Sequence, residues 1–286
     1  MLKFTLASRH MDEGSRARFF YEWSIIHVSL MLTSPSVMQL FKRYAQHFII
    51  EGVTEGVLVY RFAKEQWESF AEHWVETYQD VIASVHNPDY VARMQPHKFG
   101  SHRFITSVSN FETIYERKDF RSGGVKLVHF LKRDPEVTQN AFNEGFRNVR
   151  APKLLKSVCE TGLVRKYVQN ALIDVDPAIF KGTLFEFGSI GQYAGIEEFW
   201  FDSVEDVARL RTDPRALDAI RSSEAGLIDA DGSIAMVVKE RVVWDFVTPG
   251  ELSPRPAILN AASLEAAIDR QGYEPWELEP HAATAK

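Results

Sequence analysis

Residues Arg18–Gln46 decide the fold, because a diverged copy of this stretch returns 123 positions later. Within it, residues 23–29 read Trp-Ser-Ile-Ile-His-Val-Ser and residues 43–47 read Arg-Tyr-Ala-Gln-His. The second copy reads Phe-Arg-Asn-Val-Arg-Ala-Pro at 146–152 and Lys-Tyr-Val-Gln-Asn at 166–170. A constant offset over about thirty residues means that the same helix and the same following strand occur twice. The chain is therefore a tandem duplication of one unit.

Composition favours a globular protein that acts on a small molecule. The 286 residues suffice for two domains, and 45 % hydrophobic with 12 % aromatic residues can fill two cores. A net charge of -6 gives no general attraction to nucleic-acid phosphates or anionic lipid, and no stretch approaches the roughly 20 apolar residues of a membrane span. The single cysteine cannot form an internal disulfide, and the N-terminus lacks the apolar run of a signal sequence. We expect a cytoplasmic protein with a small-molecule substrate and with no nucleic-acid or membrane partner.

Hydrophobic spacing predicts the order βαββαβ in each unit. In the first unit the predicted elements are strand Leu2–Ser8, a helix from Ser15, strand Val37–Ile50, strand Val57–Phe62, helix Lys64–Ser84 and strand His102–Tyr115. In the second unit they are strand Val125–Leu131, helix Thr138–Lys156, strand Leu163–Asn170, strand Gly195–Phe201, helix Ser203–Ser223 and strand Ser233–Phe246.

Domain boundaries follow from this order. Matching Gly195–Phe201 to Gly56–Phe62 changes the offset from 123 to 139, which predicts a 16-residue insertion within Asp174–Ala194. The predicted units are residues 1–120 and 121–248, with the better pocket in the first, and a tail follows at 249–286. Because free tails seldom carry many large apolar residues, we expect this one to pack against the body or a second copy, which makes a homodimer a weaker expectation.

The repeat has a direct physical consequence for the fold. A βαββαβ unit makes one antiparallel sheet with both helices on one face and leaves the other face uncovered. Two tandem units can cover each other's bare sheets, with a cavity wherever the opposing side chains are short. We predict an α+β fold in which two ferredoxin-like units pack sheet to sheet as an α+β-barrel pseudo-dimer.

Four segments of the second half carry a family resemblance. They read Lys-Leu-Val-His-Phe-Leu-Lys-Arg at 126–133, Val-Arg-Ala-Pro at 149–152, Tyr-Val-Gln-Asn at 167–170 and Gly-Ile-Glu-Glu-Phe-Trp-Phe-Asp at 195–202. Together they resemble the EthD-like proteins of the dimeric α+β-barrel superfamily, and the first half resembles them more weakly. The resemblance implies a ferredoxin-like fold and dehydration, decarboxylation, cyclisation or oxidation of small, often aromatic molecules without a bound cofactor. Because some larger members of the superfamily bind haem, haem stays a minor alternative.

The histidine of the family motif survives only in the first half. His27 lies four residues after Trp23, whereas the equivalent position in the second half is Arg150. An imidazole with a pKa near 6.5 can exchange a proton at neutral pH, whereas an arginine can only hold a carboxylate or phenolate. We predict His27 as a general acid/base. A hydrogen bond at the helix end, or ligation of a metal or haem, is the alternative.

Further candidates lie in the same half. Tyr44 and His47 occupy opposite faces of one predicted strand, and Tyr60 and Arg61 occupy opposite faces of the next. The predicted catalytic residues are His27, His47, Tyr44 and Arg61. The predicted substrate-binding residues are Trp23, Tyr60, Trp67 and Trp74. For Tyr44 and His47, packing in the core or a hydrogen bond at a strand edge is the alternative, and Arg61 is expected to line a cavity or to contact the other unit.

Other kinds of chemistry are not favoured. The remaining histidines of this region, His73, His86, His97 and His102, lack metal-ligand spacing, so no metal site is predicted. The sequence also has no dinucleotide-binding, phosphate-loop or nucleophile-elbow motif. The leading hypothesis is a cofactor-independent lyase or isomerase in the catabolism of small aromatic or carbonyl-bearing molecules. The alternatives are a cofactor-free or haem-dependent monooxygenase, and a binding or stress-response protein without turnover.

Overall fold

In the computed structural model of the chain, the described residues are 1–11, 14–50, 53, 59–62, 67–94, 97, 100 and 105–247. The predicted tail at 249–286 lies outside them. The first unit contains β1 (Leu2–Ser8), α1 (Arg16–Tyr21), the π-helical turn η1 (Glu22–His27), α2 (Val28–Leu32), α3 (Pro35–Leu40), β2 (Arg43–Ile49), β3 (Arg61–Phe62), β4 (Ser69–Val75), α4 (Tyr78–Val85), α5 (Pro88–Met94) and β5 (Ile105–Glu116).

The second unit repeats the arrangement with its own connections. It contains β6 (Gly124–Arg133), α6 (Gln139–Gly145), the π-helical turn η4 (Phe146–Arg150), α7 (Ala151–Ser157), the short 3-10 helices η5 (Cys159–Thr161) and η6 (Pro177–Phe180), β7 (Val164–Leu172), β8 (Ser189–Ile190), β9 (Gly195–Phe201), α8 (Val204–Thr212), α9 (Pro214–Ser222) and β10 (Ile228–Asp245).

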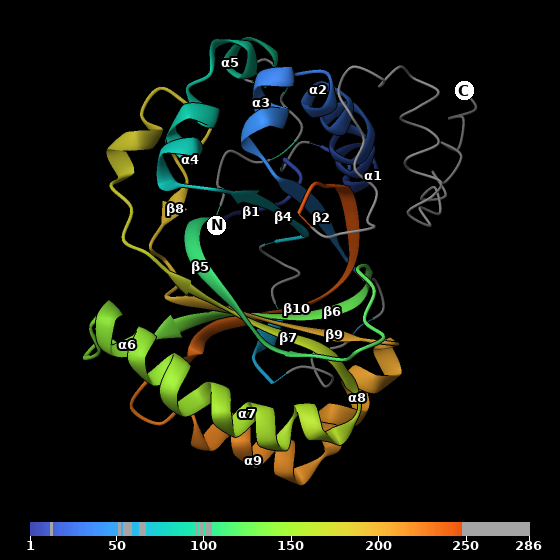
Figure 1. The fold of residues 1–286 in the computed structure, drawn as a ribbon, viewed down its shortest axis with the longest axis vertical. Helices are drawn as coiled ribbons and strands as arrows, with labels where there is room; N and C mark the ends of the chain where they lie inside the picture. The colour runs from blue at the N-terminus through green and yellow to red at the C-terminus, as the bar shows by residue number, and fades with distance from the viewer. Residues whose placement is uncertain are drawn as a thin grey trace, which may run out of the picture.

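Eight strands of the described chain close into one antiparallel barrel, in the order β1-β4-β2-β10-β6-β9-β7-β5 and back to β1. The last strand of each unit joins the two units. β5 pairs with β1 of its own unit and with β7 of the other, and β10 pairs with β6 of its own unit and with β2 of the other. Figure 1 shows the barrel between two helical layers, with α2 to α5 on one side and α6 to α9 on the other. The predicted α+β barrel of two ferredoxin-like units is confirmed.

Hydrogen bonds confirm the 123-residue register between the units. The Gln46 side chain donates to the Trp23 carbonyl and to the Tyr44 hydroxyl, both at 2.9 Å. Gln169, the equivalent residue, donates to the Phe146 carbonyl at 3.0 Å and to the Tyr167 hydroxyl at 2.7 Å. These buried contacts attach the second strand of each unit to its long helix. The same helix-to-sheet attachment is therefore present twice.

The third strand of the first unit was predicted in the wrong place. It is β4, which pairs with β1 and β2, whereas the range Lys64–Ser84 was predicted as a helix. Both faces of β4 are buried, so its sequence lacks the alternation of a half-exposed strand. Through this pairing Glu72 corresponds to Glu198, an offset of 126, so the 16-residue insertion was also wrong. A smaller correction concerns Val37–Ile50, which begins as the helix α3 before β2 starts.

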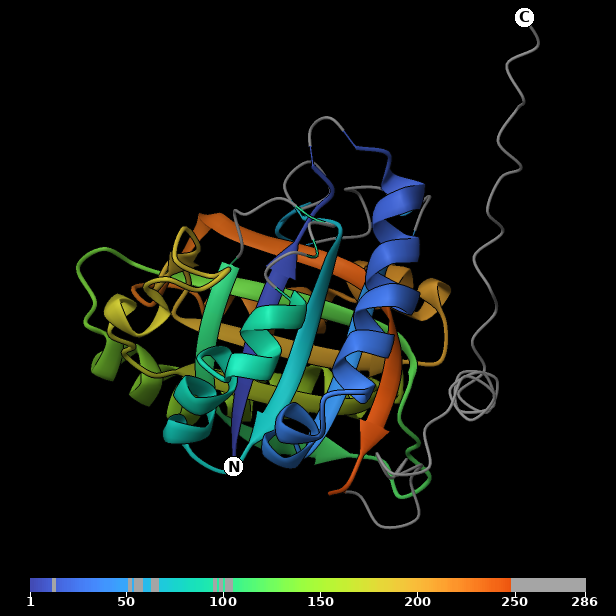
Figure 2. The same ribbon diagram turned by 90° about the horizontal axis from the view of Figure 1, so that it is seen from above.

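The connections between the second and third strands cross to the opposite unit. In the first unit β3 pairs with β10, and in the second unit β8 pairs with β5. We call residues 173–194 the arm, because their apolar side chains, including Phe180 and Phe185, join the first unit's core. Figure 2 shows the helices of the first unit in front of the barrel strands. Tyr60 enters the core of the second unit in the reciprocal way. Each unit thus completes the other.

Candidate functional site

The long helix of each unit contains a π-helical turn at the equivalent place. In the first unit η1 ends with His27, and in the second η4 ends with Arg150. A π-helical turn carries an extra residue and is frequent at functional sites. Both side chains are buried between helix and sheet. The turn therefore aims the family-motif position at the sheet in both units.

Side chains fill this helix-to-sheet space in the second unit. Arg150 donates to both oxygens of Glu197 at 2.8 Å, and the Tyr167 hydroxyl also donates to Glu197 at 2.8 Å. Arg150 also donates to the Tyr60 hydroxyl at 3.0 Å. Although burial alone would raise it, the Arg150 guanidinium lowers the pKa of Glu197 to about 2. A paired, fully buried arginine leaves no room or free charge for a substrate.

The first unit has small or neutral groups at the same positions and contains a pocket. His27 stands in place of Arg150, and Ala71 stands in place of Glu197 through the register of β4 and β9. The lining residues are Phe4, Leu6, Ser8, Trp23, His27, Met31, Phe41, Ala71, His73, Val85, Tyr90, Leu184 and Phe185. The space open to the centre of a water-sized sphere is about 30 Å³, and the arm covers it through Leu184 and Phe185. The pocket is apolar and narrow. Two of its lining residues, His27 and His73, carry an imidazole.

His73 is the pocket residue that sequence analysis missed. Its Nδ1 lies 3.2 Å from the Phe4 carbonyl and donates to it, which leaves Nε2 with a lone pair and, within the described residues, without a hydrogen-bond partner. The ring stacks on Tyr44 at 4.6 Å with an interplanar angle of 8°. Burial lowers the pKa of His73 to about 4, so the ring is neutral at pH 7. Sequence analysis missed His73 because the spacing of the apolar residues predicted a helix here, so the strand register of β4 was not known.

His27 is buried close to two other imidazoles. Burial, followed by the charges of His97 and His73, lowers the pKa of His27 well below its ordinary value. His97, 6.1 Å away between ring centroids, lies 2.8 Å from a carboxylate oxygen of Glu22. His27 is therefore neutral at pH 7. A neutral imidazole in an apolar pocket can accept a proton from a carbon acid.

Comparison with known proteins supports the resemblance. Residues 134–231 match the EthD domain family. The conidial pigment biosynthesis dehydratase EthD of Metarhizium robertsii (strain ARSEF 23 / ATCC MYA-3075) is 24 % identical over 123 residues, which are 43 % of this chain and 84 % of that protein. The likeness to EthD proteins therefore concerns the second unit, where the family match lies.

A solved structure confirms the fold of the chain. The crystal structure of an anthrone oxidase-like protein superposes with a TM-score of 0.54 and 9 % sequence identity, covering 87 % of this chain and 95 % of that one. At this identity the likeness concerns the fold alone. None of the helices in the described ranges is long and apolar enough to cross a membrane.

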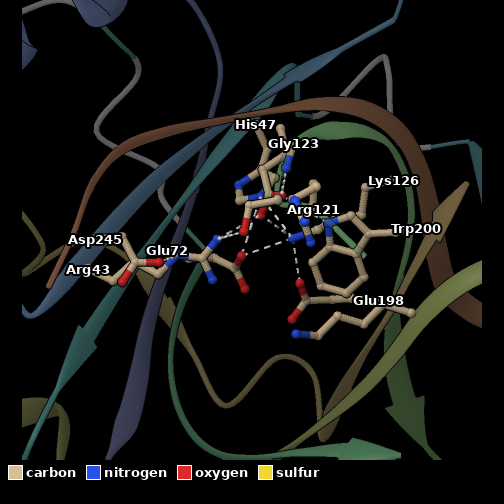
Figure 3. A network of polar contacts seen from close by, with 12 residues as sticks. Arg43, His47, Glu72, Arg121, Gly123, Lys126, Glu198, Trp200 and Asp245 are labelled. Carbon is tan, nitrogen blue, oxygen red and sulfur yellow. Dashed lines mark hydrogen bonds and ion pairs between the residues drawn. The ribbon is translucent and has the colours of Figure 1, made fainter. Parts of the chain in front are cut away.

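His47 lies away from the pocket, inside the barrel. There Lys3 donates to Glu72 at 2.8 Å and also to Glu198, and Lys126 donates to Glu72 at 3.0 Å and to Glu198 at 2.5 Å. We call these four side chains the barrel quartet. It has the symmetry of the repeat, because Lys3 corresponds to Lys126 and Glu72 to Glu198. Figure 3 shows Lys126 between His47, Glu72 and Glu198, with its ammonium over the Trp200 ring.

Lys126 occupies the position that a metal ion would need. One ligand atom from each of His47, Glu72 and Glu240 lies within 4.8 Å of the other two. The Lys126 ammonium lies 2.8 Å from His47, 3.0 Å from Glu72 and 3.5 Å from Glu240. These carboxylates, with Glu198, raise the pKa of Lys126 against the effect of burial. The positive charge that a metal would bring is already present.

The remaining predicted site residues are spread over the molecule. Trp23 lines the pocket with His27, and Tyr44 lies beside it with its hydroxyl held by Gln46. Tyr60 belongs to the second unit's core, and the side chain of Arg61 lies outside the described part of the structure. Trp67 packs in the apolar interior of the barrel, and Trp74 lines its mouth. Of the predicted site residues whose side chains the structure describes, Trp23 and His27 are the two that line the pocket.

A second depression is wider but chemically poorer. It lies between β5, β7 and η4, is lined by residues such as Glu112, Arg147 and Gln169, and has about 210 Å³ open to the centre of a water-sized sphere. The Glu112 and Arg147 side chains are both more than half exposed. Solvated charges of this kind keep ordinary reactivity. The narrower pocket, with two neutral imidazoles, is the better candidate for catalysis.

Proposed function

We propose that this EthD-like protein is a cofactor-independent dehydratase that removes water from a small aromatic molecule carrying a hydroxyl group β to a carbonyl. The observation that carries the proposal is the pairing of His27 with His73 in an apolar pocket that the second unit fills with Arg150 and Glu197. The EthD family match, and the name of the Metarhizium relative, support a dehydratase-type reaction.

The proposed proton movements balance within the substrate. His27 takes the proton from the carbon next to the carbonyl, and His73 Nε2 accepts a hydrogen bond from the substrate hydroxyl. The electron pair of the broken C–H bond forms the C=C bond, the C–O bond breaks, and His27 returns its proton to the departing oxygen. The products are an enone and water. Trp23 and Phe41, which line the same pocket, supply apolar surface for the aromatic ring.

We propose no haem at His27, because the pocket is small. The open space beside His27 is about 30 Å³, whereas pockets for drug-sized ligands measure about 300–1,000 Å³. Phe180 and Phe185 from the arm pack in the same core. A planar macrocycle would have to displace the arm and several aromatic side chains. A small substrate requires a smaller movement of the arm.

The test is turnover of β-hydroxy ketones that carry a phenyl ring, followed by the ultraviolet absorption of the conjugated enone. We expect enone formation by the purified full-length protein without added cofactor, at equal rates in air and under argon. A rate that depends on oxygen, with oxygen consumed in proportion to product, would replace the dehydratase by the monooxygenase alternative. Saturable binding of these ketones without any turnover would favour the binding-protein alternative.

A substitution in the arm is expected to change which substrates fit. Phe185→Ala removes a buried ring from the pocket wall. We expect kcat/KM for a naphthyl ketone to rise about tenfold relative to the phenyl ketone, because pocket volume sets discrimination of this order. Phe187→Ala is the matched control, since Phe187 lies on the same arm but is 74 % exposed. An unchanged naphthyl-to-phenyl ratio in Phe185→Ala would contradict a role of the arm in selecting the substrate.

A further inference from the structure

The barrel has an open mouth next to the barrel quartet, on the other side of the sheet from the pocket with His27. The mouth is lined by Lys3, Arg43, Trp74, Phe111, Thr113, Phe120, Lys166, Val168 and Trp200. His73 and Trp74 are neighbours on β4 and face opposite sides, His73 toward the pocket and Trp74 toward the mouth. The two cavities are therefore separate sites.

The lining of the mouth is cationic and aromatic. None of the described residues that line the mouth is acidic. Carboxylates that pair with its lysines, such as Glu72 and Glu116, are not part of the lining. The Lys3 ammonium lies 4.9 Å from the Trp74 ring centre, and the Lys166 ammonium lies 4.7 Å from that of Phe120. Such a surface favours a planar ligand with a negative charge.

Two of the cations keep hydrogen-bond donors in reserve. A lysine ammonium has three donors. Among the described residues, Lys3 donates only to Glu72 and Glu198, and Lys166 has its one ion pair with Glu116, at 2.6 Å. The rings of Trp74, Phe111, Phe120 and Trp200 surround these ammonium groups. A bound carboxylate could therefore accept hydrogen bonds from both lysines without displacing a glutamate.

Lys3 and its counterpart in the repeat differ in their access to the mouth, although the Lys3 side chain is only 2 % exposed. Lys126, the counterpart of Lys3, is enclosed by Glu72, Glu198 and Glu240. It is not among the described residues that line the mouth. Phe111 stands where the other half has Glu240, as the pairing of β5 and β10 with β7 and β2 shows. The first half therefore offers an aromatic wall and a free donor where the second half has a carboxylate.

We propose that the barrel mouth binds a small aromatic carboxylate, with the carboxylate group on Lys3 and Lys166 and the ring against the aromatic wall. This site is independent of the proposed dehydratase reaction. It differs from the pocket in chemistry, because the pocket offers neutral imidazoles and the mouth offers ammonium groups.

The test is a calorimetric titration of the full-length protein with benzoate, with benzyl alcohol as the neutral analogue. We expect saturable benzoate binding that weakens about tenfold or more in Lys166→Gln, because a hydrogen bond to a charged group is lost. Lys153→Gln is the matched control, since Lys153 is an exposed lysine bonded only to the Ser222 carbonyl among the described residues. Its affinity for benzoate is expected to equal that of the wild type.

Four results would overturn the proposal. Equal affinity for benzyl alcohol would mean that the charge is not recognised, and equal weakening by Lys153→Gln would mean non-specific attraction. Loss of benzoate binding in His27→Gln, with unchanged binding in Lys166→Gln, would place the ligand in the pocket. Absence of benzoate binding in the wild type would overturn it as well. The dehydratase assay is separate, because Lys166→Gln is expected to leave enone formation unchanged.

Discussion

Lys126→Met is expected to lower the free energy of unfolding by about 3–5 kcal/mol, because it removes one of the cations that neutralise three buried carboxylates. Lys126 is fully buried and contacts Glu72, Glu198 and Glu240. The methionine fills a similar volume, so the loss reports charge and not a cavity. Urea denaturation followed by tryptophan fluorescence measures it.

Two further variants make this result specific. Lys126→Met combined with Glu198→Gln removes one charge of each sign, and we expect it to be more stable than Lys126→Met alone. Arg209→Met removes the partner of Asp206 from a pair in which the arginine side chain is 69 % exposed, and we expect no measurable change. Wild-type stability in Lys126→Met would show that the barrel quartet does not hold the two units together.

His27→Ala and His27→Gln are both expected to lose about 100-fold or more in kcat for enone formation, since neither side chain transfers a proton at neutral pH. The pH profile supplies an independent check. Burial lowers the pKa of His27 well below its ordinary value, so its active, neutral form persists as pH falls through 6.5. We expect a constant kcat/KM between pH 8 and about pH 6, and a decrease only in more acidic solution.

His73→Phe is the matched variant for this series. The second unit has Phe199 at this position, stacked on Tyr167 at 4.5 Å, so a phenyl ring suits the site. We expect a folded protein whose loss, about tenfold, is smaller than that of His27→Gln, because a hydrogen bond to the substrate disappears but the proton acceptor stays. Near-wild-type kcat in folded His27→Gln would restrict His27 to holding the helix end, and the dehydratase proposal would lose its base.

The repeat allowed much of the fold to be predicted, because it fixed equivalent positions that secondary-structure patterns alone leave open. Its limit was β4. Phe70, Trp74 and Tyr78 fit helical spacing, but the first two lie on a strand with one face toward the helices and the other inside the barrel. Residues buried on both sides show no alternation of apolar and polar types. The strand became recognisable only from its pairing with β1 and β2.

The candidate site was predicted in part for the same reason. His27 and Trp23 lie on one helix, so local spacing was enough to place them together. His47 was ambiguous because a strand has two faces, and the structure directs it into the barrel. Ala71 and His73 could not be recognised without the register of β4. The contribution of Phe185 depends on a crossing between units that no local pattern contains.

The reciprocal crossing of the arm and of the segment with Tyr60 has a consequence for how this chain could diverge. When two identical chains form such a barrel, every substitution appears twice, and both pockets change together. In one continuous chain, Ala71 can open one pocket while Glu197 keeps the other filled. The wall supplied by Phe185 can then vary without altering the helix that carries His27. The proposed base and part of the pocket wall thus lie in different halves of one chain, and selection can adjust them separately.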